Sequence, residues 1–231
     1  MHYLFLDESY SATPSGTTVT VAAWTVEQTA FDAYVSRNRR LYRAPLMDSI
    51  NSMLEALGAW ALIARGSFEN GTYRIGERDS TDDIGDMARA DNVWSQCVIF
   101  ATGMLIKELI RQNVDVDIID IYHDPKTLKH DHADALAGTL RGIVVSLAKQ
   151  FTSDRKIPVM ENLSIRRVEA IGKPTKPAPT QYQLGIRVAD RLCAASQKNW
   201  GQAYSRIVHR DMSDLVRRTV QQFDGKPFSS D

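Results

Sequence analysis

The 231-residue sequence contains only two cysteines, Cys97 and Cys193, and carries no excess of charge of either sign. Two cysteines, both in apolar and helical surroundings, are too few for a disulfide scaffold or a cysteine-rich zinc site. Lys and Arg together number 28, as do Asp and Glu. This balance excludes a protein that coats nucleic acid with a wholly basic surface, but it leaves room for a local basic patch that contacts a few phosphates.

Long apolar runs and several familiar catalytic motifs are also missing. No stretch approaches the roughly 18 apolar residues that span a membrane, and no basic segment precedes the short apolar N-terminus, as it would in a signal peptide. The sequence has no phosphate-binding Gly-rich loop, dinucleotide fingerprint, or pattern typical of a Ser-His-Asp or Cys-His nucleophile. We therefore expect a cytoplasmic protein with one domain over residues 1–231, its core over about 1–200 and a C-terminal helix at about 203–223.

A short apolar segment near the N-terminus, Tyr3 to Leu6, ends in two acids, Asp7 and Glu8. Four large apolar residues in succession predict a strand that is buried on both faces. A carboxylate at the end of such a strand loses hydration unless it reaches water, a donor or a metal, so this end is a candidate site. Strand alternation directs the two acids to opposite faces. We assign Asp7 to the ligand and Glu8 to an assisting role, with a solvated turn as the alternative.

The rest of the sequence predicts alternating strands and helices. Hydrophobic periodicity and turn residues indicate strands at 17–26, 59–68, 114–124 and 161–171, and helices at 31–43, 46–57, 86–112, 126–151 and 203–223. A capping box at Thr180 and Gln183 predicts the start of one further helix, which carries Asp190. This order is that of the ribonuclease H-like fold. We predict an α/β protein with a mixed sheet of about five strands flanked by helices.

Three acids are predicted to meet in such a fold. The first strand and the next central strand are parallel neighbours there, and a late helix packs across their ends, so that Asp7, Asp124 and Asp190 could converge. Grouped carboxylates repel one another unless a cation keeps them ionised, and hard oxygen ligands select Mg²⁺ or Mn²⁺. A pair of such ions about 4 Å apart can activate a water and stabilise the leaving oxygen of a phosphodiester. The predicted chemistry is therefore phosphodiester hydrolysis.

Two segments resemble one bacterial family. Leu-Asp-Glu-Ser at residues 6–9 and Gly-Ile-Arg-Val-Ala-Asp-Arg-Leu at residues 185–192 are similar to motifs of the domain-of-unknown-function 3800 family, which has an N-terminal Asp-Glu-Ser-Gly and a C-terminal Gln-x-Ala-Asp. The resemblance implies a ribonuclease H-like fold whose functional acids correspond to Asp7, Glu8 and Asp190. Asp124 is added by its expected position in that fold.

Two positions depart from the family pattern. Tyr10 stands where the family has Gly, and Arg187 stands where it has Gln. Arg187 could face the scissile phosphate, or it could pair with Asp190 one helical turn away. Basic side chains of the helix at 31–43, of the loop before the helix that carries Asp190 and of that helix itself are candidates for binding the nucleic-acid backbone, with a solvated basic face as the alternative. These candidates are Arg37, Arg39, Arg40, Lys173, Lys176 and Arg187.

Other residues compete for roles in the same site. Asp120 is an alternative to Asp124 as the acid of its strand, and a fourth acid would come from near the start of the long helix, at Asp86 or Asp91. Three histidines form a weak zinc pattern, because they lack cysteine partners and a helical spacing of four. They are His123, His130 and His132. His123 could also orient a water or a phosphate.

The sequence thus predicts a bacterial, metal-dependent nuclease that cleaves DNA or RNA, with a role in phage defence or in a mobile element. Its site would consist of Asp7, Glu8, Asp124 and Asp190, of which Asp7, Asp124 and Asp190 bind Mg²⁺ or Mn²⁺. One alternative is a binding or scaffold subunit that keeps the fold without the chemistry. Another is a metal phosphohydrolase for a small ester, which would need an enclosed cleft instead of an open groove. A homo-oligomer or a partner protein is compatible with exposed arginines in the last helix.

Overall fold

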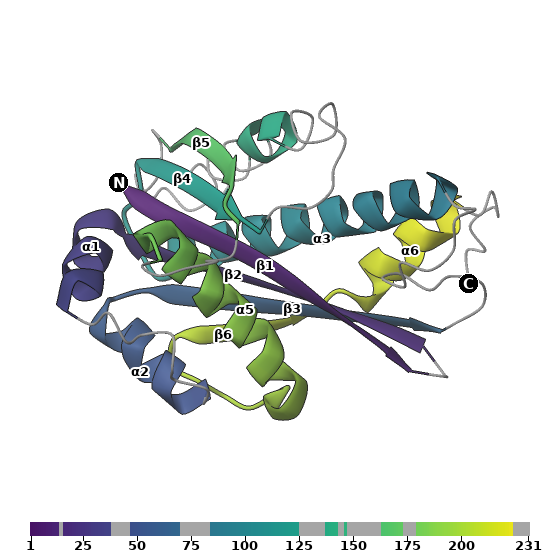
Figure 1. The fold of residues 1–231 in the computed structure, drawn as a ribbon, viewed down its shortest axis with the longest axis horizontal. Helices are drawn as coiled ribbons and strands as arrows, with labels where there is room; N and C mark the ends of the chain where they lie inside the picture. The colour runs from purple at the N-terminus through teal and green to yellow at the C-terminus, as the bar shows by residue number, and fades with distance from the viewer. Residues whose placement is uncertain are drawn as a thin grey trace.

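The structure is a computed structural model that describes residues 1–13, 16–37, 47–69, 84–124, 137–142, 146, 163–172 and 179–223. Its elements, in chain order, are β1 (His2–Thr13), β2 (Gly16–Glu27), α1 (Gln28–Arg37), α2 (Met47–Ala56), β3 (Trp60–Glu69), α3 (Ile84–Arg111), β4 (Ile118–His123), β5 (Ser164–Ala170), α5 (Gln181–Asn199), β6 (Ile207–Asp211) and α6 (Ser213–Phe223). Figure 1 shows their arrangement.

One mixed sheet organises these elements, with the strand order β5-β4-β1-β2-β3-β6. β1, β2 and β3 form an antiparallel meander, while β4 runs parallel to β1 and β5 runs parallel to β4. This combination of order and direction is the ribonuclease H-like arrangement, so the predicted fold class is confirmed. The sixth strand, β6, adds to the free side of β3 in parallel.

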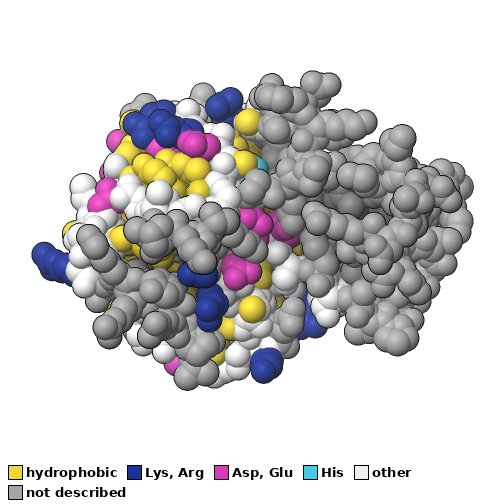
Figure 2. Space-filling view, in the orientation of Figure 1, with side chains coloured by type: hydrophobic (Ala, Val, Ile, Leu, Met, Phe, Trp, Pro, Cys, Tyr) yellow, Lys and Arg dark blue, Asp and Glu magenta, His cyan; other side chains and the backbone are white. Residues whose placement is uncertain are grey.

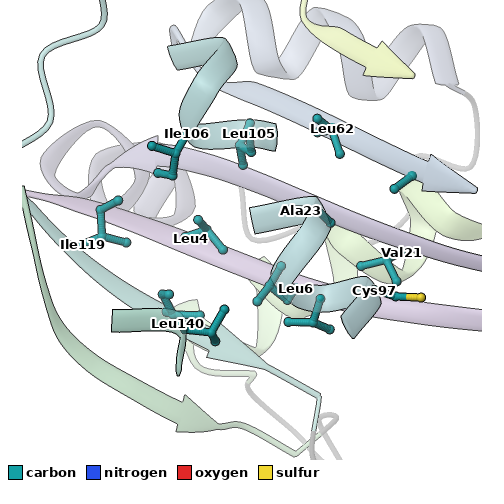
Figure 3. Close-up of a cluster of buried hydrophobic side chains, with 14 of the residues drawn as sticks. Leu4, Leu6, Val21, Ala23, Leu62, Cys97, Leu105, Ile106, Ile119 and Leu140 are labelled. Atoms are coloured by element: carbon teal, nitrogen blue, oxygen red, sulfur yellow. The ribbon is translucent and has the colours of Figure 1, made fainter. Parts of the chain in front are cut away.

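The two faces of the sheet are covered by different helices, because side chains alternate along each strand. Leu4 and Leu6 of β1 lie in the core beneath α3 and α6. Tyr3 and Phe5 lie in the opposite core, beneath α1, α2 and α5. Figure 3 shows part of the first core, including Leu4, Leu6, Val21, Ala23, Leu62, Cys97, Leu105 and Ile106. We call these the α3 face and the α5 face of the sheet.

The predicted C-terminal helix at 203–223 is wrong in its first half. Ile207 to Asp211 form β6, in register with Ala61 to Arg65 of β3. The helix α6 begins only at Ser213, whose backbone N–H donates to Asp211 Oδ1 at 2.8 Å. Two β-branched residues in succession, Ile207 and Val208, favour a strand. A five-residue strand is too short for periodicity to separate it from the adjoining helix.

Of two other predicted elements, one begins where it was predicted and one begins later. The capping box at Thr180 is confirmed, since Thr180 Oγ1 accepts from Gln183 N–H and the Gln183 side chain accepts from Thr180 N–H. The strand predicted at 114–124 begins later, at Ile118. Asn113, with a φ of 55°, lies just beyond the end of α3 and turns the chain.

Within the described residues, no helix is both long and apolar enough to cross a membrane.

A buried carboxylate joins α3 to the added strand β6. The side chain of Glu108 is 3% exposed, and its Oε1 accepts hydrogen bonds from Arg111 at 2.5 Å and from Gln112 at 2.8 Å. Arg210 of β6 lies 4.0 Å from the other oxygen, Oε2. Burial alone would raise the pKa of Glu108, but these donors and charges outweigh burial and hold the pKa below its usual value.

Replacing Glu108 by Gln is expected to lower the free energy of unfolding by about 1 kcal/mol at pH 7. Because the folded-state pKa is depressed, the stabilisation exists above the unfolded-state pKa of about 4.3 and is lost as the pH falls through the lower folded value. Urea unfolding at pH 7 and at pH 3 measures this difference. A gap between the native protein and Glu108→Gln that is the same at both pH values would contradict an ionised, ion-paired Glu108.

Candidate active site

Asp7 lies at the point in β1 where the pairing with β4 ends. The strand β1 does not end at the acids, as the sequence predicted, but continues to Thr13 in a hairpin with β2. Only its parallel pairing with β4 ends there, at the pair Leu6 and His123. Asp124 N–H then donates to Leu6 O at 3.3 Å, which continues the ladder by one bond. Asp124 and Asp7 are therefore neighbours across two strands, with backbones roughly 5 Å apart.

The strand alternation separates the two acids of β1 as predicted. Asp7 follows Tyr3 and Phe5 on the α5 face, is 2% exposed, and accepts the backbone N–H of Glu8 on Oδ1 at 2.9 Å. Glu8 follows Leu6 on the α3 face and is 8% exposed. Burying a carboxylate costs free energy unless it is compensated, so two adjacent buried acids are unusual in a strand. The side chain of Glu8 therefore points away from Asp7, and the contact between the two residues is made by the backbone N–H of Glu8.

The helix α5 brings Asp190 to the same part of the α5 face. The Cys193 thiol donates to the carbonyl oxygen of Asp7 at 3.4 Å and lies 3.6 Å from that of Thr20. Asp190 precedes Cys193 by three residues, which is less than one turn, and is half-buried. Asp190 therefore lies within one turn of the residue of α5 that contacts the Asp7 backbone. Figure 2 shows acidic side chains gathered near the middle of this view, with basic side chains beside them.

Asp120, the competitor of Asp124, is held in a different interaction. It pairs in register with Tyr3, four residues before Asp7, and is 1% exposed. Its two oxygens accept from Arg166 of β5, Oδ1 from Nε at 2.9 Å and Oδ2 from the terminal nitrogen Nη2. This two-pronged ion pair neutralises Asp120 within the fold. Asp124 is therefore the acid of β4 that lies next to Asp7.

His123 lies on the other face of the sheet from Asp7. It is in register with Leu6, is 7% exposed, and has Nδ1 2.9 Å from the carbonyl oxygen of Asp124. Burial lowers the pKa of His123, although the Asp124 carbonyl and carboxylate oppose this shift. His123 therefore lies on the α3 face, away from the side chain of Asp7, and its role in orienting a water or a phosphate stays a prediction.

A divalent cation at these acids would need several ligands close together. Among the described residues, no three or more His, Cys, Asp or Glu side chains are grouped so that they could hold a metal ion. The three predicted acids therefore do not form a closed cage. Mg²⁺ is usually held by one or two carboxylates together with waters and substrate phosphates. Asp7 and Asp124, whose backbones are neighbours across the ladder, supply oxygen donors of the kind that such an open site uses.

The remaining predicted site residues divide into three groups. Arg37 is exposed at the end of α1, and Arg187 is half-buried one turn before Asp190 on α5. The structure describes the backbone of Asp86 and Asp91 in α3, but not their side chains. Six other candidates lie outside the described residues: Arg39, Arg40, His130, His132, Lys173 and Lys176.

Two residues that position the site were not recognised from the sequence. Gly185 brings α5 into direct contact with β1, because a Cβ atom there would lie 2.2 Å from the ring of Phe5. Its carbonyl oxygen accepts from Trp24 Nε1 at 2.9 Å. Cys193 is the second, through its contact with the Asp7 carbonyl. A glycine within a predicted helix is a usable signal for close packing, whereas nothing in the sequence indicates the contact of Cys193.

Comparison with known proteins gives only weak likenesses. No protein-family model matches the sequence, and neither does any curated protein. Among solved structures, the chain is similar to ribonuclease HII of Archaeoglobus fulgidus, in its complex with PCNA, with a TM-score of 0.35 and 12% identity over 99% of this chain and 81% of that one. It is also similar to a mutant of Bst-RNase HIII, with a TM-score of 0.34 and 12% identity over 83% of this chain and 50% of that one. Likenesses this weak carry no argument about activity.

Proposed function

We propose that this chain is a divalent-metal-dependent nuclease that hydrolyses phosphodiester bonds. One observation carries the proposal. The parallel ladder of β1 and β4 ends at the pair Leu6 and His123, so the residues that come next, Asp7 and Asp124, lie side by side just beyond the ladder. Asp7 is almost completely buried on the face that α5 covers. Such a pair of acids would be costly in a purely structural role, because neighbouring carboxylates repel each other, and here Asp7 is buried and Asp124 is half-buried.

The roles of the residues follow from where they lie. Asp7 and Asp124 would hold Mg²⁺ or Mn²⁺, one ion or a pair, which when bound activates a water and neutralises charge on the phosphate. Asp190 would complete the ligand set from α5, where this half-buried residue can meet a substrate that arrives from solvent. Arg187, half-buried one turn earlier, would contact a phosphate oxygen. Glu8 would keep Asp7 in place through the backbone N–H that Asp7 accepts.

A nucleic acid suits this site better than a small ester. Asp190 is flanked on α5 by Arg187 and Arg191, both half-buried, and basic side chains lie beside the acidic ones in Figure 2. Cations on both sides of an acidic centre match a substrate that carries phosphates on both sides of the scissile bond. DNA, RNA and their hybrid all have this property, and a role in phage defence or in a mobile element is compatible with each.

A second candidate function is a ribonuclease H-like binding or scaffold subunit that has lost its chemistry. The observation in its favour is that the described residues contain no group of three potential metal ligands. The two candidates differ in whether the protein cuts nucleic acid in a metal-dependent way.

The test is a cleavage assay on labelled single-stranded, double-stranded and hybrid DNA and RNA, in Mg²⁺, in Mn²⁺ and in EDTA. The native protein is expected to cut at least one substrate with metal and none in EDTA, and Asp190→Asn is expected to cut none. Asp214→Asn is the matched control, because it makes the same chemical change at a side chain of α6 that is 74% exposed. Cutting that survives Asp190→Asn unchanged either comes from a contaminant or shows that Asp190 is not part of the site. If the native protein cuts nothing, the scaffold function is the better conclusion.

A further inference from the structure

The α5 face of the sheet changes character at the level of Asp7. Before that level, two facing positions of β1 and β2 are filled by large aromatic side chains, Phe5 and Trp24, whose ring centres lie 5.0 Å apart. Beyond it, the facing positions are Ser9 and Thr20, which are in register with each other. Ser9 lies on the same face of the sheet as Asp7, because it follows Asp7 by two residues in the same strand. Along β1, a hydroxyl side chain therefore follows the acid where the apolar core of this face ends.

The hydroxyl group of Ser9 is enclosed, yet it has no hydrogen-bond partner among the described residues. Ser9 as a whole is half-buried, but its Oγ atom is shielded from solvent. A hydroxyl group in this state has lost its hydrogen bonds to water and has gained none in return, which destabilises the fold. Buried polar atoms nearly always have a partner, so an orphaned one beside a buried acid points to a group that the hydroxyl binds.

The position of this hydroxyl relative to Asp7 indicates which group it binds. Two residues of extended strand separate their α carbons by about 7 Å, a separation that suits a polar contact through an intervening water. Mg²⁺ that is held by one or two carboxylates keeps several of its waters. A bound cation polarises such a water, so the water becomes a strong hydrogen-bond donor that needs an acceptor. Ser9 Oγ has the lone pairs to accept this bond.

We propose that Ser9 is a positioning residue for the cation, and that its Oγ accepts a hydrogen bond from a water bound to the Mg²⁺ or Mn²⁺ that Asp7 holds. The inference rests on the proposed function, because it adds a residue to the same metal site. Contacts of this kind orient the ligands of a metal, and their loss commonly lowers metal affinity by about 10- to 100-fold. The bond would also satisfy the hydroxyl that the described side chains leave without a partner.

The test compares the native protein with Ser9→Ala by calorimetric titration with Mn²⁺, in the absence of nucleic acid. Ser9→Ala is expected to weaken Mn²⁺ binding by about 10-fold. In EDTA, the same variant should melt about 2 to 4 °C above the native protein, because alanine removes the orphaned hydroxyl. Metal affinity and stability thus move in opposite directions. A serine with a merely structural role would instead lose stability on substitution.

The matched control is Thr102→Val in α3, the helix that covers the opposite face of the sheet from Asp7. Thr102 is fully buried, and its Oγ1 likewise has no hydrogen-bond partner among the residues that the structure describes. Valine has nearly the same shape without the hydroxyl, so Thr102→Val should also melt higher in EDTA. Its affinity for Mn²⁺ should equal that of the native protein. Ser9→Thr, which keeps a hydroxyl, should bind Mn²⁺ more tightly than Ser9→Ala does.

The titration and the cleavage assay together separate this proposal from the nuclease function. Metal-dependent cleavage, with the Mn²⁺ affinity of Ser9→Ala unchanged, refutes the role of Ser9 and leaves the nuclease function in place. An affinity that falls in Ser9→Ala but not in Thr102→Val, with no cleavage of any substrate, supports the role of Ser9 and refutes the nuclease. If Ser9→Ala loses stability together with affinity, or if Thr102→Val loses as much affinity, the role of Ser9 is refuted. A native protein that binds no Mn²⁺ refutes both proposals.

Discussion

Asp7→Asn is expected to abolish metal-dependent cleavage, with a loss in rate of roughly three orders of magnitude or more. Asparagine has the size and shape of the carboxylate that it replaces, so it fills the same space beside α5. It cannot supply the negative charge that a divalent cation needs. Asp7 is 2% exposed, so a water molecule from bulk solvent cannot replace the lost ligand easily. The measurement is the rate of cleavage of the best substrate in saturating Mg²⁺ or Mn²⁺.

The neighbouring strand offers a matched pair of variants for the same question. Asp124→Asn is expected to be as inactive as Asp7→Asn, because Asp124 lies beside Asp7 at the end of the β1–β4 ladder. Asp120→Asn makes the identical change on the same strand and the same face, but at a carboxylate that is held by Arg166. It should lose about 2 kcal/mol of stability and keep its rate per folded molecule. Loss of cleavage in Asp120→Asn, with cleavage kept in Asp124→Asn, would reverse the assignment.

Metal binding can be followed apart from cleavage. A ligand that binds the folded state stabilises it by mass action, so Mg²⁺ or Mn²⁺ should raise the melting temperature of the native protein. The rise should disappear in Asp7→Asn and in Asp124→Asn and persist in Asp120→Asn. A variant that keeps the metal-dependent rise but loses cleavage would show that its acid acts on the reacting atoms without holding the cation.

Much of the fold was predictable because its signals are local. The apolar run from Tyr3 to Leu6 and the capping box at Thr180 depend on residues within a few positions of one another, and the structure has both. The parallel pairing of β1 with β4 was predicted differently, from the order of elements, because few topologies accommodate that order. The position of Asp124 beside Asp7 followed from that pairing alone.

Features that depend on long-range packing could not be predicted in the same way. The sequence cannot show that β1 continues past Asp7 as a hairpin strand, because the residues that stabilise it belong to β2. The strand β6 was missed for a related reason, since its partner β3 is more than a hundred residues earlier in the chain. The face on which His123 lies depends on where β4 begins in the ladder. A shift of one residue in the register of β4 would move His123 to the opposite face of the sheet.

Gly185→Ala is expected to lower the free energy of unfolding by about 3 kcal/mol, at the upper end of the cost of overpacking. The added Cβ atom would lie 2.2 to 2.4 Å from three ring carbons of Phe5. That ring cannot move aside easily, because it is fully buried and packs against Trp24 at 5.0 Å and Tyr122 at 5.7 Å. The helix α5 must therefore shift away from β1. Thermal unfolding should show a melting temperature lower by about 6 to 12 °C.

The same shift would move Asp190 away from Asp7, so cleavage per folded molecule should fall together with stability. Gly138→Ala is the matched control, since no atom lies within 4 Å of its added Cβ in the helical segment 137–142. Alanine there should stabilise the helix by about 0.5 to 1 kcal/mol. Phe5→Leu removes the ring edge that Gly185→Ala would strike, so the double variant should be at least 1 kcal/mol more stable than the sum of the single effects. If the stability effects of the two substitutions simply add, Gly185 and Phe5 are not in direct contact, and this contact cannot be what holds α5 and Asp190 against β1.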